Sequence, residues 1–76
     1  MKIQFNSEAE LYQRILPALR MKVRELSLAN LTEYTVWNYL KNEKWKYQTG
    51  LTLAKMVHDI LEVTREEITK YLLGKQ

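Results

Sequence analysis

The residues most able to do chemistry are concentrated in one stretch, 36–47, which carries both tryptophans, two of the five tyrosines and three lysines. Nucleic acid recognition needs cations that meet phosphates and flat rings that stack on bases. The stretch therefore predicts a binding surface for RNA or for a protein partner. Its candidate contact residues are Lys41, Lys44, Trp45, Lys46 and Tyr47.

A purely structural role also fits this stretch. Lysines near a helix C-terminus complement the negative end of the helix dipole, and tryptophans are highly buried on average. We expect Trp37, which lies on an apolar stripe, in the core. Trp45 fits the core of a small bundle, whereas its flanking lysines favour a position near solvent, and Tyr47 fits either role. A contact surface requires Trp45 and Tyr47 to be open to water.

A second group of cations lies on the first predicted helix. Arg20 and Arg24 are spaced i, i+4 and share a face. Together with Arg14 they can form a stripe that meets phosphates, although such a stripe is more often a solvated helix face. We include Arg20 and Arg24 among the candidate contact residues for an RNA or protein partner.

His58, Asp59 and Glu62 form the cluster that comes nearest to an active site. At i, i+4 spacing, His58 and Glu62 can share a proton or two positions on a metal ion. A metal site needs at least one further ligand, and no other predicted helix offers an obvious one. The chain has no cysteine, which excludes thiolate ligands and nucleophiles. We therefore predict no catalytic residue, no metal and no cofactor, in a protein that is not an enzyme.

Length and charge limit the remaining classes. Seventy-six residues make one small domain, 1–76, and 12 basic against 9 acidic side chains leave a net charge of +3. This mild excess permits an RNA, DNA or anionic-membrane partner without requiring one. No run approaches the roughly 18 apolar residues of a membrane span, and residues 1–6 lack the apolar part of a signal peptide. We expect a cytoplasmic protein with no membrane span, either monomeric or oligomeric.

The hydrophobic pattern places these residues on an all-α, single-domain bundle of four helices. The predicted helices span about residues 8–28, 33–44, 53–62 and 65–73, with 1–6 poorly ordered and 45–50 as a loop. Pro17 lies within the first helix. Because proline lacks an amide donor and its ring clashes with the carbonyl one turn earlier, we expect the helix to be kinked or broken there.

Capping residues stand at the start of each predicted helix: Ser7 with Glu10, Thr32, Thr52, and Thr64 with Glu67. Their hydroxyls accept hydrogen bonds from amides of the first turn, which lack partners within the helix. The two pairs have the spacing of a capping box. At the other end of the chain, Gly74 is placed to end the fourth helix in the left-handed conformation.

Several of these motifs resemble those of the bacterial post-transcriptional regulator family typified by ComN. The shared features are Pro-x-Leu-x-x-Lys-Val at 17–23, two tryptophans eight residues apart, and Val-x-Asp-Ile-Leu at 57–61. The resemblance covers roughly residues 11–63. It implies a small cytoplasmic helical protein that acts at the mRNA level without catalysis, through RNA or protein contacts. The family tends to have a glycine-containing turn where this chain has Asn30.

Residues 54–73 can also be compared with a helix-turn-helix, which makes duplex DNA an alternative partner. In that arrangement Val57, Leu61, Val63 and Ile68 pack the two helices together, and the second helix presents Arg65, Glu66, Thr69 and Lys70. His58 stands where a small residue usually allows close packing, and Glu62 where the turn usually has glycine. The presented face is half acidic, which opposes phosphate, so duplex DNA is the less favoured partner.

Overall fold

The structure, a computed structural model, describes residues 8–74. It consists of helices, and no strand lies within this range. The elements are α1 (Glu8–Leu26), α2 (Glu33–Tyr39), the π-helix η1 (Leu40–Lys44), α3 (Leu53–Leu61) and α4 (Arg65–Gly74). The predicted all-α class is confirmed. The expectation for residues 1–6 and the predicted cap at Ser7 lie outside the described residues.

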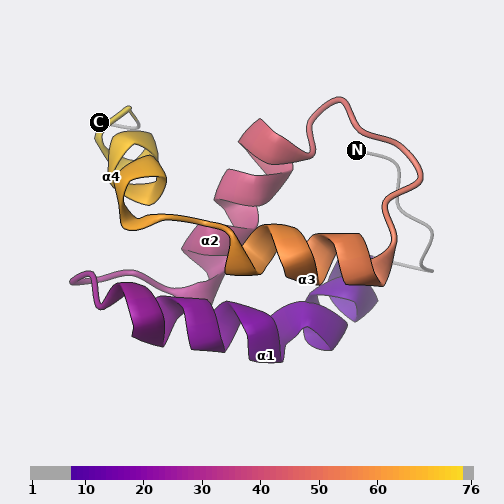
Figure 1. The fold of residues 1–76 in the computed structure, drawn as a ribbon, viewed down its shortest axis with the longest axis horizontal. Coiled ribbons are helices and arrows are strands. Elements are labelled where there is room, and N and C mark those ends of the chain that lie inside the picture. Colours follow the sequence, from indigo (N-terminus) through magenta and orange to yellow (C-terminus); the bar gives the residue numbers. More distant parts are fainter. Residues whose placement is uncertain (1–7, 75–76) are drawn as a thin grey trace.

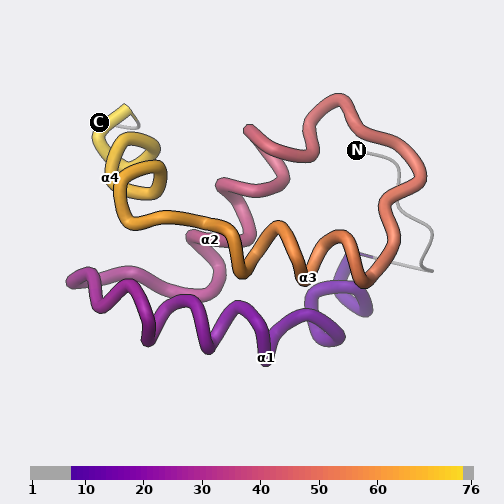
Figure 2. Tube along the Cα trace, in the orientation of Figure 1, coloured from indigo at the N-terminus to yellow at the C-terminus, as the bar shows by residue number. Residues whose placement is uncertain are grey.

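Helices α1 and α3 lie side by side (Figure 1). Helix α2 packs against α1 and continues into η1, and α4 packs against α2. The trace in Figure 2 shows η1 and α4 rising away from the α1–α3 pair. The core lies where these helices meet. Its buried hydrophobic residues are Leu11, Ile15, Leu19, Leu26, Leu31, Val36, Trp37, Tyr39, Leu40, Trp45, Leu51, Met56, Ile60, Val63 and Ile68.

Helix α1 passes through Pro17 without ending. Ile15 and Leu19, on either side of the proline, are fully buried and hold both parts of the helix on the core. Pro17 itself is exposed, so the carbonyl that it leaves without an amide donor can meet water. Of the two alternatives for the first helix, a break at Pro17 was therefore wrong. A kink at Pro17 remains a prediction.

The turn after α1 uses two residues in the left-handed region, Ser27 with φ 51° and Asn30 with φ 64°. Helix α1 ends at Leu26 rather than near residue 28 because Ser27 leaves the helical conformation. Asparagine tolerates the left-handed region better than most residues other than glycine. Asn30 can therefore form a turn without glycine.

The predicted helix 33–44 is two elements. It begins as expected, with the hydroxyl of Thr32 accepting a hydrogen bond of 3.2 Å from the amide of Thr35. At Leu40 the α-helix gives way to η1, whose closing bond runs from the amide of Trp45 to the carbonyl of Leu40 at 2.7 Å. Such a wide turn inserts one extra residue and changes the direction of every side chain after it.

The later helices also begin at the predicted threonines. Thr52 accepts from the amide of Lys55 at 3.1 Å, and Thr64 accepts from the amide of Glu67 at 3.2 Å. Gly74 lies inside α4 and is not a left-handed cap, so that expectation was wrong. A Cβ atom at Gly74 would meet nothing within 4 Å, which means that neither packing nor backbone conformation demands glycine here.

None of the helices in the described part of the chain combines the length and the apolar character needed to cross a membrane.

Candidate interaction surface

Trp45, expected on a contact surface, lies inside the protein. Its side chain is fully buried, and its ring meets that of Trp37 edge to face with the centroids 6.1 Å apart. The indole Nε1 donates a hydrogen bond to Asp59 Oδ2 at 2.8 Å. Of the two roles that the sequence left open for Trp45, the structure therefore supports the core, and its inclusion among the candidate contact residues was wrong because its indole is not available to a partner.

The π-turn explains this burial. In a regular α-helix, residues 40 and 45 would point about 140° apart around the axis, because each residue turns by about 100°. The i to i+5 bond between Leu40 and Trp45 brings these two positions close to the same side of the helix. Both side chains are completely buried as a result.

Asp59, together with His58 and Glu62, was the cluster nearest to an active site in the sequence. In the structure its carboxylate has a structural role. Besides the indole of Trp45, its carboxylate accepts a hydrogen bond from Lys55 Nζ at 3.0 Å. Burial works to raise the pKa of Asp59, but the hydrogen bonds from Trp45 and Lys55 outweigh it, so the pKa is lowered from its ordinary value. The carboxylate is held ionised as an anchor for both donors.

The other two members of that cluster lie on the surface. His58 Nε2 and Glu62 Oε1 are 3.8 Å apart, and both side chains are well exposed. Within residues 8–74, no group of three or more potential metal-ligating side chains is placed to hold an ion. This pair on α3 is a solvated helix-surface contact.

The three lysines of the 36–47 stretch point in different directions. Lys41 reaches α1, where its Nζ lies 3.2 Å from Glu8 Oε2, and Lys44 reaches α4, where its Nζ lies 3.6 Å from Glu67 Oε1. Lys46 lies in the loop after η1, and its Nζ is 5.4 Å from the ring centroid of Tyr47. The five candidate residues thus do not form one continuous face.

Several candidate residues are exposed as a contact surface requires, among them Lys46 and Tyr47 of the loop after η1. Tyr47 is 87% exposed, and the ammonium group of Lys46 lies over its ring. On α1, Arg24 is exposed, while Arg20 makes a long ion pair of 3.9 Å with Glu33 at the start of α2. Arg14 pairs with Glu10 at 3.5 Å, so the predicted basic stripe on α1 is partly neutralised.

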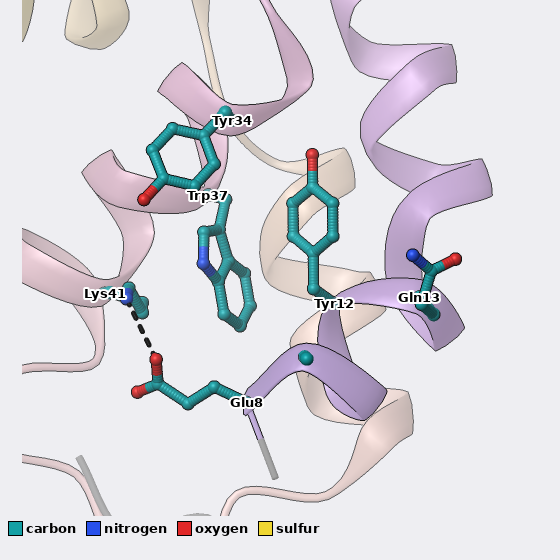
Figure 3. A pocket seen from close by; sticks show the side chains of 7 residues that line it. Glu8, Tyr12, Gln13, Tyr34, Trp37 and Lys41 are labelled. Carbon is teal, nitrogen blue, oxygen red and sulfur yellow. Dashed lines mark hydrogen bonds and ion pairs between the residues drawn. The ribbon is translucent and has the colours of Figure 1, made fainter.

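A pocket that sequence reasoning did not find opens between the first turns of α1 and helix α2. It has a volume of about 260 Å³. Its lining residues, which define the aromatic pocket, are Glu8, Ala9, Tyr12, Gln13, Tyr34, Trp37 and Lys41. Figure 3 shows the three rings gathered around it and Lys41 reaching toward Glu8.

The rings of the aromatic pocket meet edge to face. Tyr12 on α1 meets both rings of α2, with centroid distances of 5.5 Å to Trp37 and 6.3 Å to Tyr34. Trp37 is only 3% exposed and forms the floor, as expected for a core residue, whereas Tyr34 is 60% exposed and forms the rim. Burial, followed by the nearby carboxylate of Glu33, raises the pKa of Tyr12, so its phenol stays neutral.

One signal for this pocket was present in the sequence. Tyr34, Trp37 and Lys41 follow one another at spacings of three and four, which places them on one side of a helix. Lys41 Nζ lies 5.3 Å from the ring centroid of Trp37. The contribution of Tyr12 depends on how α1 packs against α2, which no local pattern specifies.

Lys22 is a second residue whose role was missed. Its side chain is only 2% exposed, and its Nζ donates to the carbonyl of Leu61 at 2.7 Å and to Glu25 Oε2 at 2.8 Å. The carbonyls at a helix C-terminus lack partners within the helix and carry partial negative charge. Lys22 therefore joins α1 to the C-terminal end of α3.

A further polar contact joins α2 to α4. The hydroxyl of Tyr39 donates to Glu67 Oε1 at 3.0 Å, and the ring of Tyr39 packs edge to face on Tyr71. Burial and this hydrogen bond raise the pKa of Tyr39 to about 12. In the helix-turn-helix arrangement, Leu61 should be packed between α3 and α4, yet it is 47% exposed and α4 packs against α2.

These features describe a small helical protein whose buried polar groups stabilise the fold and whose exposed rings and cations lie at a pocket and a loop. The sequence matches the post-transcriptional regulator family over residues 9–75. It is also 31% identical over 67 residues to the post-transcriptional regulator ComN of Bacillus subtilis (strain 168), a match that covers 83% of this chain and 68% of that relative.

The chain therefore belongs to the post-transcriptional regulator family, and the resemblance drawn from its motifs is confirmed. No solved structure gives a significant match to it.

Proposed function

We propose that the protein is a non-enzymatic regulatory module that acts at the mRNA level by contacting single-stranded RNA. The observation that carries this proposal is the pairing of Tyr47, 87% exposed, with the ammonium group of Lys46. An exposed ring offers a surface on which any base can stack, and a cation beside it can meet the neighbouring phosphate. Membership of a family of post-transcriptional regulators supports RNA as the anionic partner.

The titratable side chains support binding rather than catalysis. Asp59 accepts hydrogen bonds from Trp45 and Lys55, and Tyr39 donates to Glu67, so these groups serve the fold. His58 and Glu62 pair on an exposed helix surface. Lys44 in η1, and Arg20 and Arg24 on α1, are proposed to add to the attraction for phosphate.

The test is binding of single-stranded RNA across a series of salt concentrations. Affinity is expected to fall as salt rises, with a slope in log–log form of about −0.7 per phosphate contacted. Absence of binding at low salt, or binding that is indifferent to salt, would exclude the RNA contact. A protein partner would then be the better interpretation of the exposed residues.

A charge-matched pair of variants separates a local contact from a general effect of net charge. Replacing Lys44 and Lys46 together by alanine should weaken RNA binding and reduce the salt slope by about 0.7 for each phosphate that the variant no longer neutralises. Replacing Arg65 and Lys70 together removes the same charge from the exposed face of α4. Equal effects of the two double variants would show that only net charge matters.

A further inference from the structure

We propose that the aromatic pocket seats one unpaired nucleobase of single-stranded RNA, with Tyr34 as the stacking ring and Lys41 as the partner of the adjoining phosphate. This inference rests on the proposed function and names a site for it. It concerns a different place from the loop of Lys46 and Tyr47.

The shape of the pocket suits a single flat ring. Its volume of about 260 Å³ lies below the roughly 300–1,000 Å³ of pockets that enclose drug-sized ligands. The buried ring of Trp37 closes the floor, and Tyr12 forms a wall. Tyr34, with 60% of its surface exposed, stands at the mouth where a base would enter. Every nucleobase has a π-face, so a pocket of this kind accepts any of them.

The lining of the pocket includes one uncharged amide that can meet the edge of a base. Gln13 lines the pocket, and its amide can both donate and accept hydrogen bonds. Bases carry donors and acceptors along their edges, and unpaired bases expose them. The pocket thus combines stacking surfaces with one adaptable polar group and needs no fixed sequence of bases.

The charges at the mouth favour a phosphate beside the base. Lys41 Nζ lies 5.3 Å from the ring centroid of Trp37 and 3.2 Å from Glu8 Oε2. The side chain of Glu8 is 55% exposed and that of Lys41 is 22% exposed, so the ion pair opens to water on the Glu8 side, where a phosphate can take the place of the carboxylate on Lys41. Arg20 forms an ion pair with Glu33, the residue that precedes Tyr34 in the chain. Arg20 therefore adds a second cation on this side of the molecule.

The same charges disfavour a cationic ligand, for which three rings and a carboxylate would otherwise be a suitable cage. The ammonium group of Lys41 already lies over the face of Trp37. A lysine or arginine side chain from a protein partner would meet that like charge in a confined space. Glu8 therefore distinguishes the two ligands, because removing its charge helps a phosphate and harms a cation.

The experiment compares two labelled oligomers of equal length, an oligouridylate and an abasic ribose-phosphate chain, by fluorescence anisotropy with the 76-residue chain. The base-bearing oligomer is expected to bind more tightly than the abasic one. Tyr34→Ala should weaken binding of the oligouridylate by roughly 5- to 150-fold, the range expected for losing one stacked base. Tyr34→Phe keeps the ring and should bind as the unmodified protein does.

Two further variants complete the test. Glu8→Gln should tighten binding of the oligouridylate, because Lys41 is then free for phosphate; weaker binding would overturn the proposal. Met21→Ala removes an apolar side chain that is also 60% exposed, but on α1 outside the pocket, and should have no effect. Circular dichroism checks that each variant keeps its helices.

The outcomes separate this inference from the function on which it rests. Binding of the oligouridylate unchanged by Tyr34→Ala would overturn the base-binding pocket while leaving RNA binding at Lys46 and Tyr47 intact. Equal affinity for the two oligomers would overturn base stacking at both places and leave only the attraction between cations and phosphates. Binding of neither oligomer at low salt would overturn both.

Discussion

The indole nitrogen of Trp45 and the carboxylate of Asp59 form a hydrogen bond of 2.8 Å across 14 residues of sequence. Trp45 follows the π-helix η1, and Asp59 lies in the last turn of α3, so this contact fixes the end of η1 against the C-terminal part of α3. The long loop between them is otherwise exposed except for Leu51. The Trp45–Asp59 hydrogen bond therefore holds the start of that loop against α3, the helix that follows the loop.

Removal of the Asp59 carboxylate should destabilise the protein. Asp59→Ala leaves the buried indole N–H of Trp45 without its acceptor, and an unsatisfied buried donor costs about 1–3 kcal/mol. Asp59→Asn keeps one carbonyl oxygen for the indole and should lose less. Urea unfolding of both variants measures the difference, and a fully stable alanine variant would show that the bond does not hold the fold.

The same carboxylate should make stability depend on pH in acid. The pKa of Asp59 is lowered from 3.8 in the folded protein, so the folded state favours the ionised form. The resulting stabilisation is present above the unfolded-state pKa and is lost as the pH falls through the lower folded-state pKa. Urea unfolding between neutral pH and about pH 3 should show a smaller loss for Asp59→Asn than for the unmodified protein. Identical pH profiles would contradict this assignment.

Much of the fold follows from local signals. Thr32, Thr52 and Thr64 all cap the helices that the sequence pattern assigns to them, because each hydroxyl satisfies an amide of the next turn whatever the tertiary structure. The end of the second helix was not predictable in the same way. Spacing rules assume 3.6 residues per turn, and the single wide turn at Leu40 invalidates them for Trp45.

The candidate site was predictable only in part. Tyr34, Trp37 and Lys41 share a helix face that the sequence reveals, but Tyr12 joins them only because α1 packs against α2. Lys22 illustrates the same difficulty, because a lysine on a helix is exposed by default. Its burial depends on the carbonyl of Leu61, 39 residues away, which accepts its hydrogen bond.

Lys22 should stabilise the packing of α1 on α3. Lys22→Ala removes a buried aliphatic chain and the donor to the Leu61 carbonyl, and should cost about 2–4 kcal/mol. Lys22→Met keeps most of the packing and should cost less. Glu25→Gln is the comparison variant, because Glu25 is 66% exposed and the glutamine keeps a carbonyl oxygen that can accept from Lys22 Nζ, so it should cost less than Lys22→Ala. Equal losses of stability in Lys22→Met and Lys22→Ala would show that the hydrogen bond to the Leu61 carbonyl, and not the packing of the aliphatic chain, accounts for the effect.

Tryptophan fluorescence should report the burial of Trp45 directly. In Trp37→Phe, Trp45 is the remaining indole, fully buried and donating to Asp59, so its emission should be blue-shifted and resistant to a soluble quencher. The same variant unfolded in urea supplies the reference for an exposed indole. Red-shifted, readily quenched emission from the folded variant would place Trp45 at the surface and restore it to the contact residues. Trp37 also forms the floor of the aromatic pocket. The stability of Trp37→Phe should therefore show whether the core needs the larger tryptophan ring at this position.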